Sequence, residues 1–98
     1  MKAIADITLV PIGVGASLSE YIATCERIFE GHGLTTQLHA NGTNVEGEWE
    51  KVFKALEDCH EAVHKMGAPR IHTSIQVGTR IDRDQTMADK VASVEQKL

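Results

Sequence analysis

Two hydrophobic periodicities alternate along the chain. Apolar and polar residues alternate with a period of two over residues 3–12 and 70–79, which is typical of strands with one buried face. Two shorter extended runs, 35–40 and 43–47, are joined at Asn41-Gly42, a dipeptide suited to the positive φ angles of a tight hairpin. The pattern therefore predicts four strands.

Apolar residues at spacings of three and four predict helices between the strands. The first helix begins at Ser17-Leu18-Ser19-Glu20, which has the form of a capping box, and ends at Gly31. The second runs from about Glu48 to Gly67, with Pro69 two residues beyond. Their apolar stripes are Leu18, Tyr21, Ile22, Cys25, Ile28 and Phe29, and Trp49, Val52, Phe53, Leu56, Cys59, Val63 and Met66.

The tail, residues 84–98, predicts a short third helix. Met87, Val91, Val94 and Leu98 recur at helical spacing among charged residues. This apolar edge is thin, so the helix needs a partner surface.

The order of these elements predicts the fold. Residues 1–98 make a single α+β domain, because a chain of this length has apolar material for one core. The order βαββαβ favours a ferredoxin-like sandwich, in which right-handed crossovers place both helices on one face of a four-stranded antiparallel sheet. The short C-terminal helix is added to this unit.

The composition of the chain argues against two classes of binding partner. The net charge is −4 and no basic cluster is present, so we expect no nucleic acid partner. No apolar run approaches the roughly 20 residues that span a bilayer, so we expect no membrane partner and a cytoplasmic location. Cys25 and Cys59 both fall on helical apolar stripes, and we expect two buried, reduced thiols.

The face of the sheet opposite the helices carries the candidate chemistry. If Ile7, Leu9, Leu38, Val45, Ile71, Ile75 and Val77 face the helices, the pleat places the intervening residues on the other side. Those residues are Asp6, Thr8, Val10, Gln37, His39, Asn44, Glu46, His72, Ser74 and Gln76. This face has no lysine or arginine. It is either exposed to water or covers a second subunit or a polar pocket, and we expect self-association through it or along a sheet edge.

One string matches a metallopeptidase motif. His60-Glu61-Ala62-Val63-His64 has the letters His-Glu-x-x-His, but His60 lies within the stripe that the helix buries and Glu61 lies on the solvent side. We therefore expect core or interface histidines, with no metal and no cofactor.

Four blocks of sequence together resemble the thiamine-binding, YkoF-like family. They are Val10-Pro11-Ile12-Gly13, Val45-Glu46-Gly47-Glu48-Trp49, Cys59-His60-Glu61, and Thr79-Arg80-Ile81-Asp82-Arg83 with the tail Val91-Ala92-Ser93-Val94-Glu95. The resemblance implies a ferredoxin-like fold, dimers that assemble into tetramers, and binding of thiamine or its hydroxymethylpyrimidine moiety near subunit interfaces. It does not imply activity as an enzyme.

An aminopyrimidine ligand suggests which side chains bind it. Glu46 is the first candidate, because a carboxylate accepts a hydrogen bond from the amino group and the adjacent Gly47 permits close approach. The set is completed by side chains that both donate and accept hydrogen bonds, namely Asn44, Gln76, Thr8 and Ser74. Asp6 has the negative charge that suits the cationic thiazolium. Arg80 and Arg83 either hold a phosphate or pair with acids of a neighbouring subunit.

The first expectation is therefore a homo-oligomeric protein that binds this small ligand. The second is an oligomeric structural or regulatory module without a thiamine ligand. A metal-dependent hydrolase comes third.

Overall fold

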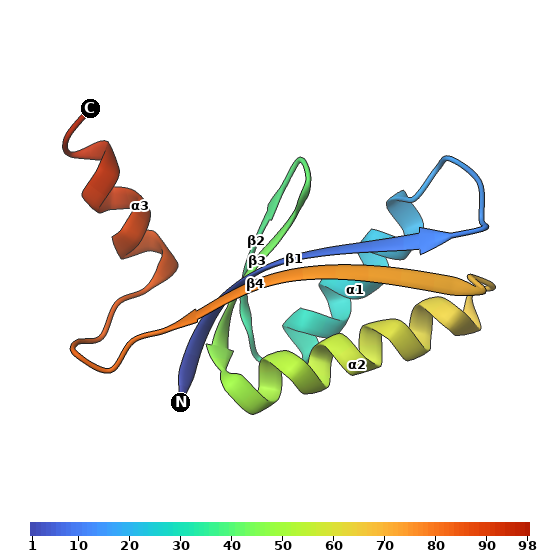
Figure 1. Ribbon diagram of the computed structural model, residues 1–98, viewed down its shortest axis with the longest axis horizontal. Helices are drawn as coiled ribbons and strands as arrows, with labels where there is room; N and C mark the ends of the chain where they lie inside the picture. The colour runs from blue at the N-terminus through green and yellow to red at the C-terminus, as the bar shows by residue number, and fades with distance from the viewer.

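The computed structural model describes residues 1–98 and shows the expected order of elements (Figure 1). These are β1 (Lys2–Ile12), α1 (Ser19–Gly31), β2 (Thr35–His39), β3 (Gly42–Glu48), α2 (Trp49–Lys65), β4 (Arg70–Thr79) and α3 (Met87–Glu95). The strand order is β2-β3-β1-β4 and every neighbouring pair is antiparallel. This is the ferredoxin-like α+β fold with an additional C-terminal helix, as the sequence predicts.

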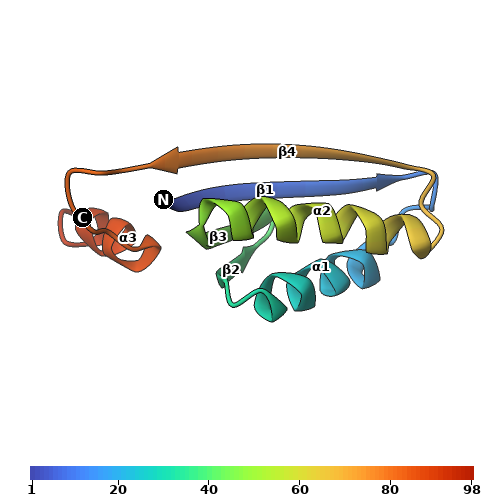
Figure 2. The same cartoon turned by 90° about the horizontal axis from the view of Figure 1, so that it is seen from below.

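Helices α1 and α2 cover one face of the sheet, where the core lies (Figure 2). The central strand β1 buries its alternate residues, from Ala3 to Leu9, against them. The helices contribute mainly small and branched side chains to this core: Cys25 and Phe29 from α1, and Val52, Ala55, Cys59 and Val63 from α2. Leu38, expected in this core, lies on the helix side but is 61% exposed, because β2 is a short edge strand.

The sequence predicts the end of α2 correctly but not the start of α1. Helix α2 ends as predicted, with Gly67 at a φ of 112°, in the left-handed region that glycine favours. The expected capping box at the start of α1 is wrong. Leu18 is the N-cap, at φ −112° and ψ −2°, and no side chain caps the helix. Ser17 lies one residue too early for its hydroxyl to reach the free amides.

The hairpin also differs from the expected Asn41-Gly42 turn. The turn residues are Ala40 and Asn41, and neither has a positive φ. Gly42 is the first residue of β3 and pairs with His39. A Cβ at Gly42 would lie 2.7 Å from the backbone oxygen of Ile7. Glycine is therefore required here for the close approach of two strands.

Helix α3 lies at one end of the molecule, away from α1 and α2 (Figure 1). It begins with a capping box in which Thr86 Oγ1 accepts from the Asp89 amide and Asp89 accepts from the Thr86 amide. Only Met87 of this helix is buried. Val91, Val94 and Leu98 are exposed, so the thin apolar edge stays uncovered in one copy. None of the three helices combines the length and the apolar character that crossing a membrane requires.

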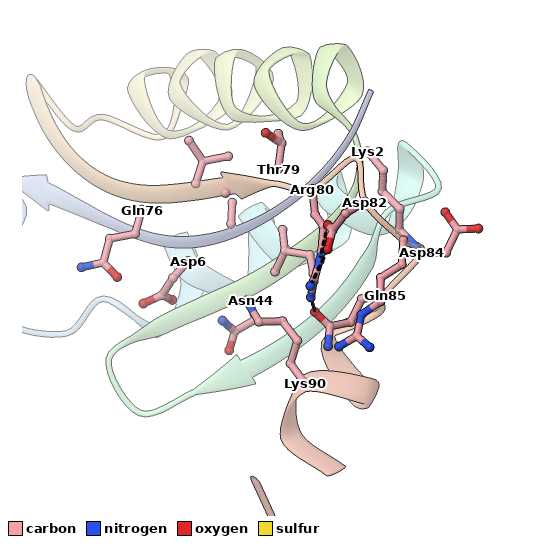
Figure 3. Close-up of a pocket in the computed structure, with 15 residues that line it drawn as sticks. Lys2, Asp6, Asn44, Gln76, Thr79, Arg80, Asp82, Asp84, Gln85 and Lys90 are labelled. Carbon is pink, nitrogen blue, oxygen red and sulfur yellow. Dashed lines mark hydrogen bonds and ion pairs between the residues drawn. The ribbon is translucent and has the colours of Figure 1, made fainter. Parts of the chain in front are cut away.

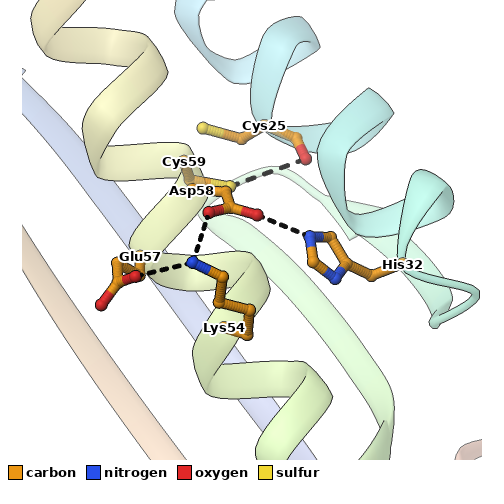
Figure 4. A network of polar contacts seen from close by, with 6 residues as sticks. All are labelled: Cys25, His32, Lys54, Glu57, Asp58 and Cys59. Carbon is orange, nitrogen blue, oxygen red and sulfur yellow. Dashed lines mark hydrogen bonds and ion pairs between the residues drawn. The ribbon is translucent and has the colours of Figure 1, made fainter.

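A polar network and a thiol contact join α1 to α2 (Figure 4). His32, at the end of α1, and Lys54 both contact Asp58, at 2.8 and 3.2 Å. These neighbours, His32 first, lower the pKa of Asp58. Beside this network, Cys59 Sγ lies 3.8 Å from the Cys25 carbonyl oxygen. Both cysteines are buried free thiols, as predicted, and the contact with Cys25, together with burial, raises the pKa of Cys59.

Candidate functional site

Three of the predicted ligand-binding residues lie side by side on the open face, the sheet face opposite α1 and α2. In the strand register, Asp6 on the central strand pairs with Asn44 on β3 and with Gln76 on β4. Directly opposed residues of antiparallel strands have Cβ atoms about 4.5–5.5 Å apart. The result is a row of one carboxylate between two amides.

This row forms one end of a groove of about 650 Å³, the open-face groove, which is bounded by the sheet, the loop after β4 and α3 (Figure 3). Ile4 and Gly78 pair with each other in its floor. A Cβ built on Gly78 would meet no atom within 4 Å. Because glycine has no side chain, the space above the middle of the groove floor is open.

Asp6 is oriented by a histidine from the edge strand. His39 Nε2 lies 2.7 Å from Asp6 Oδ1, and His39 Nδ1 accepts a hydrogen bond from the Asn41 amide at 3.3 Å. With Nδ1 as the acceptor, Nε2 is the ring nitrogen that donates to Asp6. The second carboxylate oxygen of Asp6 has no partner in the chain.

Glu46, the first candidate in the sequence, is covered by the chain itself. It is 8% exposed, and its Oε2 accepts from the Met87 amide at 3.0 Å, with Lys2 Nζ at 3.7 Å. Gly47 does not open a ligand approach, because the side chain of Leu34 fills the space beside it. A ligand contact of Glu46 stays a prediction, while its observed role is to hold the start of α3.

Thr8 and Ser74 pair with each other on the open face but do not line the groove. Thr8 Oγ1 donates to the Asn41 carbonyl at 2.8 Å. They lie one pair beyond Asp6 along the sheet, so a ligand above Gly78 would lie on the other side of the row.

At the basic end of the groove, the sequence singles out Arg80 and Arg83, for a phosphate or a neighbouring subunit, but not Lys2 or Lys90. All four residues line this end. Lys2 faces the open side one residue before the predicted strand, so the expectation of a face without lysine is wrong at its end. The Arg80 guanidinium donates to Asp82 Oδ2 and Gln85 Oε1, both at 2.8 Å, and lowers the pKa of Asp82 to about 2.

The two histidines of the metallopeptidase-like string bond within the chain. His60 Nε2 lies 2.7 Å from Thr73 Oγ1, and His64 Nδ1 donates to the Ala68 carbonyl at 2.7 Å. Burial, followed by the neighbouring His64, lowers the pKa of His60. The structure contains no group of three or more histidine, cysteine, aspartate or glutamate residues placed to hold a metal ion.

A second cavity, of about 400 Å³, lies between α1 and the β2–β3 hairpin. Apolar side chains dominate its lining, among them Leu9, Ile22, Phe29 and Leu38. Its polar lining residues are Thr8, His39, Asn41 and Thr43, so Thr8, a predicted ligand-binding residue, lines this cavity and not the open-face groove.

Comparison with known proteins identifies the family of this chain. The family model described as thiamine-binding protein matches residues 5–95. The chain belongs to the thiamine-binding protein family. The resemblance inferred from the four sequence blocks is thereby confirmed.

The relatives of this thiamine-binding family member span nearly its whole length. The UPF0045 protein sll0230 of Synechocystis sp. is 53% identical over 97% of this chain and 78% of its own. The crystal structure of the hypothetical protein MJ1052 of Methanocaldococcus jannaschii matches with a TM-score of 0.89 at 27% identity, covering 97% of each chain.

A further solved structure, from Thermotoga maritima, is of a protein assigned provisionally to thiamine biosynthesis or salvage. It matches with a TM-score of 0.81 at 20% identity, over 96% of this chain and 99% of that one. At this identity the likeness shows the shared fold alone.

Proposed function

We propose that this protein binds thiamine or its hydroxymethylpyrimidine moiety in the open-face groove. The observation that carries the proposal is the row of Asp6, Asn44 and Gln76, which lie side by side at one end of the groove. Membership of the thiamine-binding family supports the class of ligand.

The donors and acceptors of this row match an aminopyrimidine. The free oxygen of Asp6 accepts from the exocyclic amino group, while the amides of Asn44 and Gln76 donate to ring nitrogens and accept in turn. Ile4 supplies an apolar surface beneath the ring. None of the four aromatic residues lines the groove, so polar contacts at the edge of the ring, rather than stacking, orient the ligand.

Calorimetric titration with thiamine and with hydroxymethylpyrimidine tests the proposal. We expect saturable binding of both, weakened about ten- to a hundredfold in Asp6→Asn, because a hydrogen bond to a charged group contributes about 1.5–3 kcal/mol. Asn44→Ala and Gln76→Ala weaken it less, since each removes a neutral partner.

Gln37→Ala is the matched control. Gln37 lies on the open face and pairs with Asn44, but does not line the groove. Binding that is lost equally in Gln37→Ala and Gln76→Ala would contradict the site, and no heat with either ligand would contradict the function.

We further propose that the protein acts as a homo-oligomer in the cytoplasm. The uncovered apolar edge of α3 supports self-association, and two free buried thiols suit a reducing compartment. The same edge supports an oligomeric structural or regulatory module as the second candidate function.

A further inference from the structure

The basic residues of this acidic chain gather at one end of the open-face groove. Four of its 10 lysine and arginine residues line the groove, although the chain as a whole carries a net charge of −4. They come from three separate segments: the start of β1, the loop after β4, and α3. The opposite end carries the Asp6 row, which has one carboxylate and no cation, whereas the basic end holds the four cations together with Asp82 and Asp84.

Two of these cations are free. Arg80 is engaged by Asp82 and Gln85, and Lys2 lies 3.7 Å from Glu46. The side chains of Arg83 and Lys90 are exposed and make no hydrogen bond or ion pair within the chain. An arginine and a lysine without protein partners at the end of a groove are suited to bind an anion.

The acids around this end have other direct partners, although the charge of Arg83 still contributes to the lowered pKa of Asp82 and of Asp89. Asp82 is paired with Arg80, Glu46 accepts from the Met87 amide, and Asp89 accepts from the Thr86 amide. Asp84 is the remaining acid of the lining, and its carboxylate points away from Lys90 in Figure 3.

We propose that the ligand is a phosphate ester, whose phosphate is bound by Arg83 and Lys90. The inference rests on the proposed function, which places the aminopyrimidine at Asp6, Asn44 and Gln76. The ligand class is then the phosphate ester of the hydroxymethyl-aminopyrimidine or of thiamine. A groove of about 650 Å³ lies within the range of small-molecule sites and has room for both parts.

Calorimetry compares hydroxymethylpyrimidine and thiamine, each with and without a phosphate, and inorganic phosphate alone. We expect each monophosphate to bind about tenfold or more tightly than its parent, as charge-assisted contacts to a phosphate predict. The double variant Arg83→Gln/Lys90→Gln removes this advantage and leaves the affinity for hydroxymethylpyrimidine, the uncharged parent compound, unchanged.

The control is Lys51→Gln/Lys65→Gln on α2. It changes the net charge of the chain by the same amount, and neither residue lines the groove. This variant keeps the preference for the phosphate esters if the effect is local to the groove.

The possible failures are distinguishable. Equal affinity for esters and parents overturns this inference and leaves the proposed function standing. Inorganic phosphate that binds as tightly as the esters shows a simple anion site and also overturns it. The absence of binding by every compound overturns the proposed function and this inference together.

Discussion

Gly78 is the position at which a substitution is expected to affect ligand binding while leaving folding intact. It lies in the floor of the open-face groove, and a Cβ there meets no atom within 4 Å. A larger side chain at this position therefore fills ligand space without disturbing the packing of the sheet.

We predict that Gly78→Val weakens thiamine binding about tenfold or more, while the melting temperature stays the same or rises slightly, since valine favours strands. Calorimetry and thermal unfolding measure the two effects. His72→Val, on the same strand and face but outside the groove, keeps full affinity. Unchanged binding in Gly78→Val would place the ligand elsewhere.

Glu46 shows what strand alternation predicts and what it leaves out. The period of two places Glu46 on the open face, and the register confirms that placement. Its partner is the Met87 amide, 41 residues further along the chain. The return of the tail over the sheet depends on this long-range contact, and no local pattern around Glu46 indicates it.

We predict that Glu46→Gln loosens the start of α3. Glutamine keeps an acceptor oxygen but loses the charge that favours a helix N-terminus, a loss of about 1 kcal/mol. Hydrogen exchange at the Met87 amide should become roughly fivefold faster, as that energy predicts. Glu48→Gln, which leaves α3 untouched, is the control. Exchange that is unchanged in Glu46→Gln would mean that α3 is held by other contacts.

Among the elements, the helix ends were the hardest to predict. Ser17 to Glu20 has the letters of a capping box but α1 begins without one, while Thr86 and Asp89 form a box that the sequence pattern did not single out. The same short polar residues suit turns and caps alike. The strands were predicted to within about a residue or two at each end, because burial of one face fixes their period.

The pairing of α1 with α2 should depend on pH through Asp58. Its pKa lies below the ordinary aspartate value of 3.8, chiefly because of His32. The stabilisation that the Asp58 carboxylate provides is therefore complete above the ordinary aspartate pKa of 3.8. It is lost as the pH falls through the lower pKa of the folded state. We predict that Asp58→Asn lowers the melting temperature at neutral pH and that its difference from the unmodified protein shrinks on acidification.

Thermal unfolding followed by circular dichroism, from neutral to strongly acidic pH, measures this dependence. Glu61→Gln is the matched control, because Glu61 is an exposed acid of the same helix without an ion pair. A difference between Asp58→Asn and the unmodified protein that stays constant with pH would show that Asp58 acts through packing and not through its charge.

A single copy of the protein leaves apolar side chains exposed on its surface. Ile81, in the loop after β4, and Leu98, at the C-terminus, are 96% and 97% exposed, and Val91 and Val94 are exposed along α3. We predict a dimer or tetramer at micromolar concentration by sedimentation, with association weakened in Val91→Glu/Val94→Glu. A stable monomer in the unmodified protein would contradict this prediction.

The arrangement of the strands around β1 is the feature on which the proposed site depends. It brings Asp6, Asn44 and Gln76 together from three strands. The sequence predicted their shared face, but the groove needs α3 and the loop after β4 as its other wall, and their position depends on long-range contacts.

The most direct test is a titration of the ¹⁵N-labelled protein with thiamine, in which the amide chemical shifts report binding at each residue. We predict that the largest changes cluster at Asp6, Asn44, Gln76 and Gly78, and that in Gly78→Val they require a thiamine concentration about tenfold higher or more. Changes centred on the apolar cavity beside Ile22 and Phe29, or no changes at all, would contradict the proposed binding of thiamine in the open-face groove.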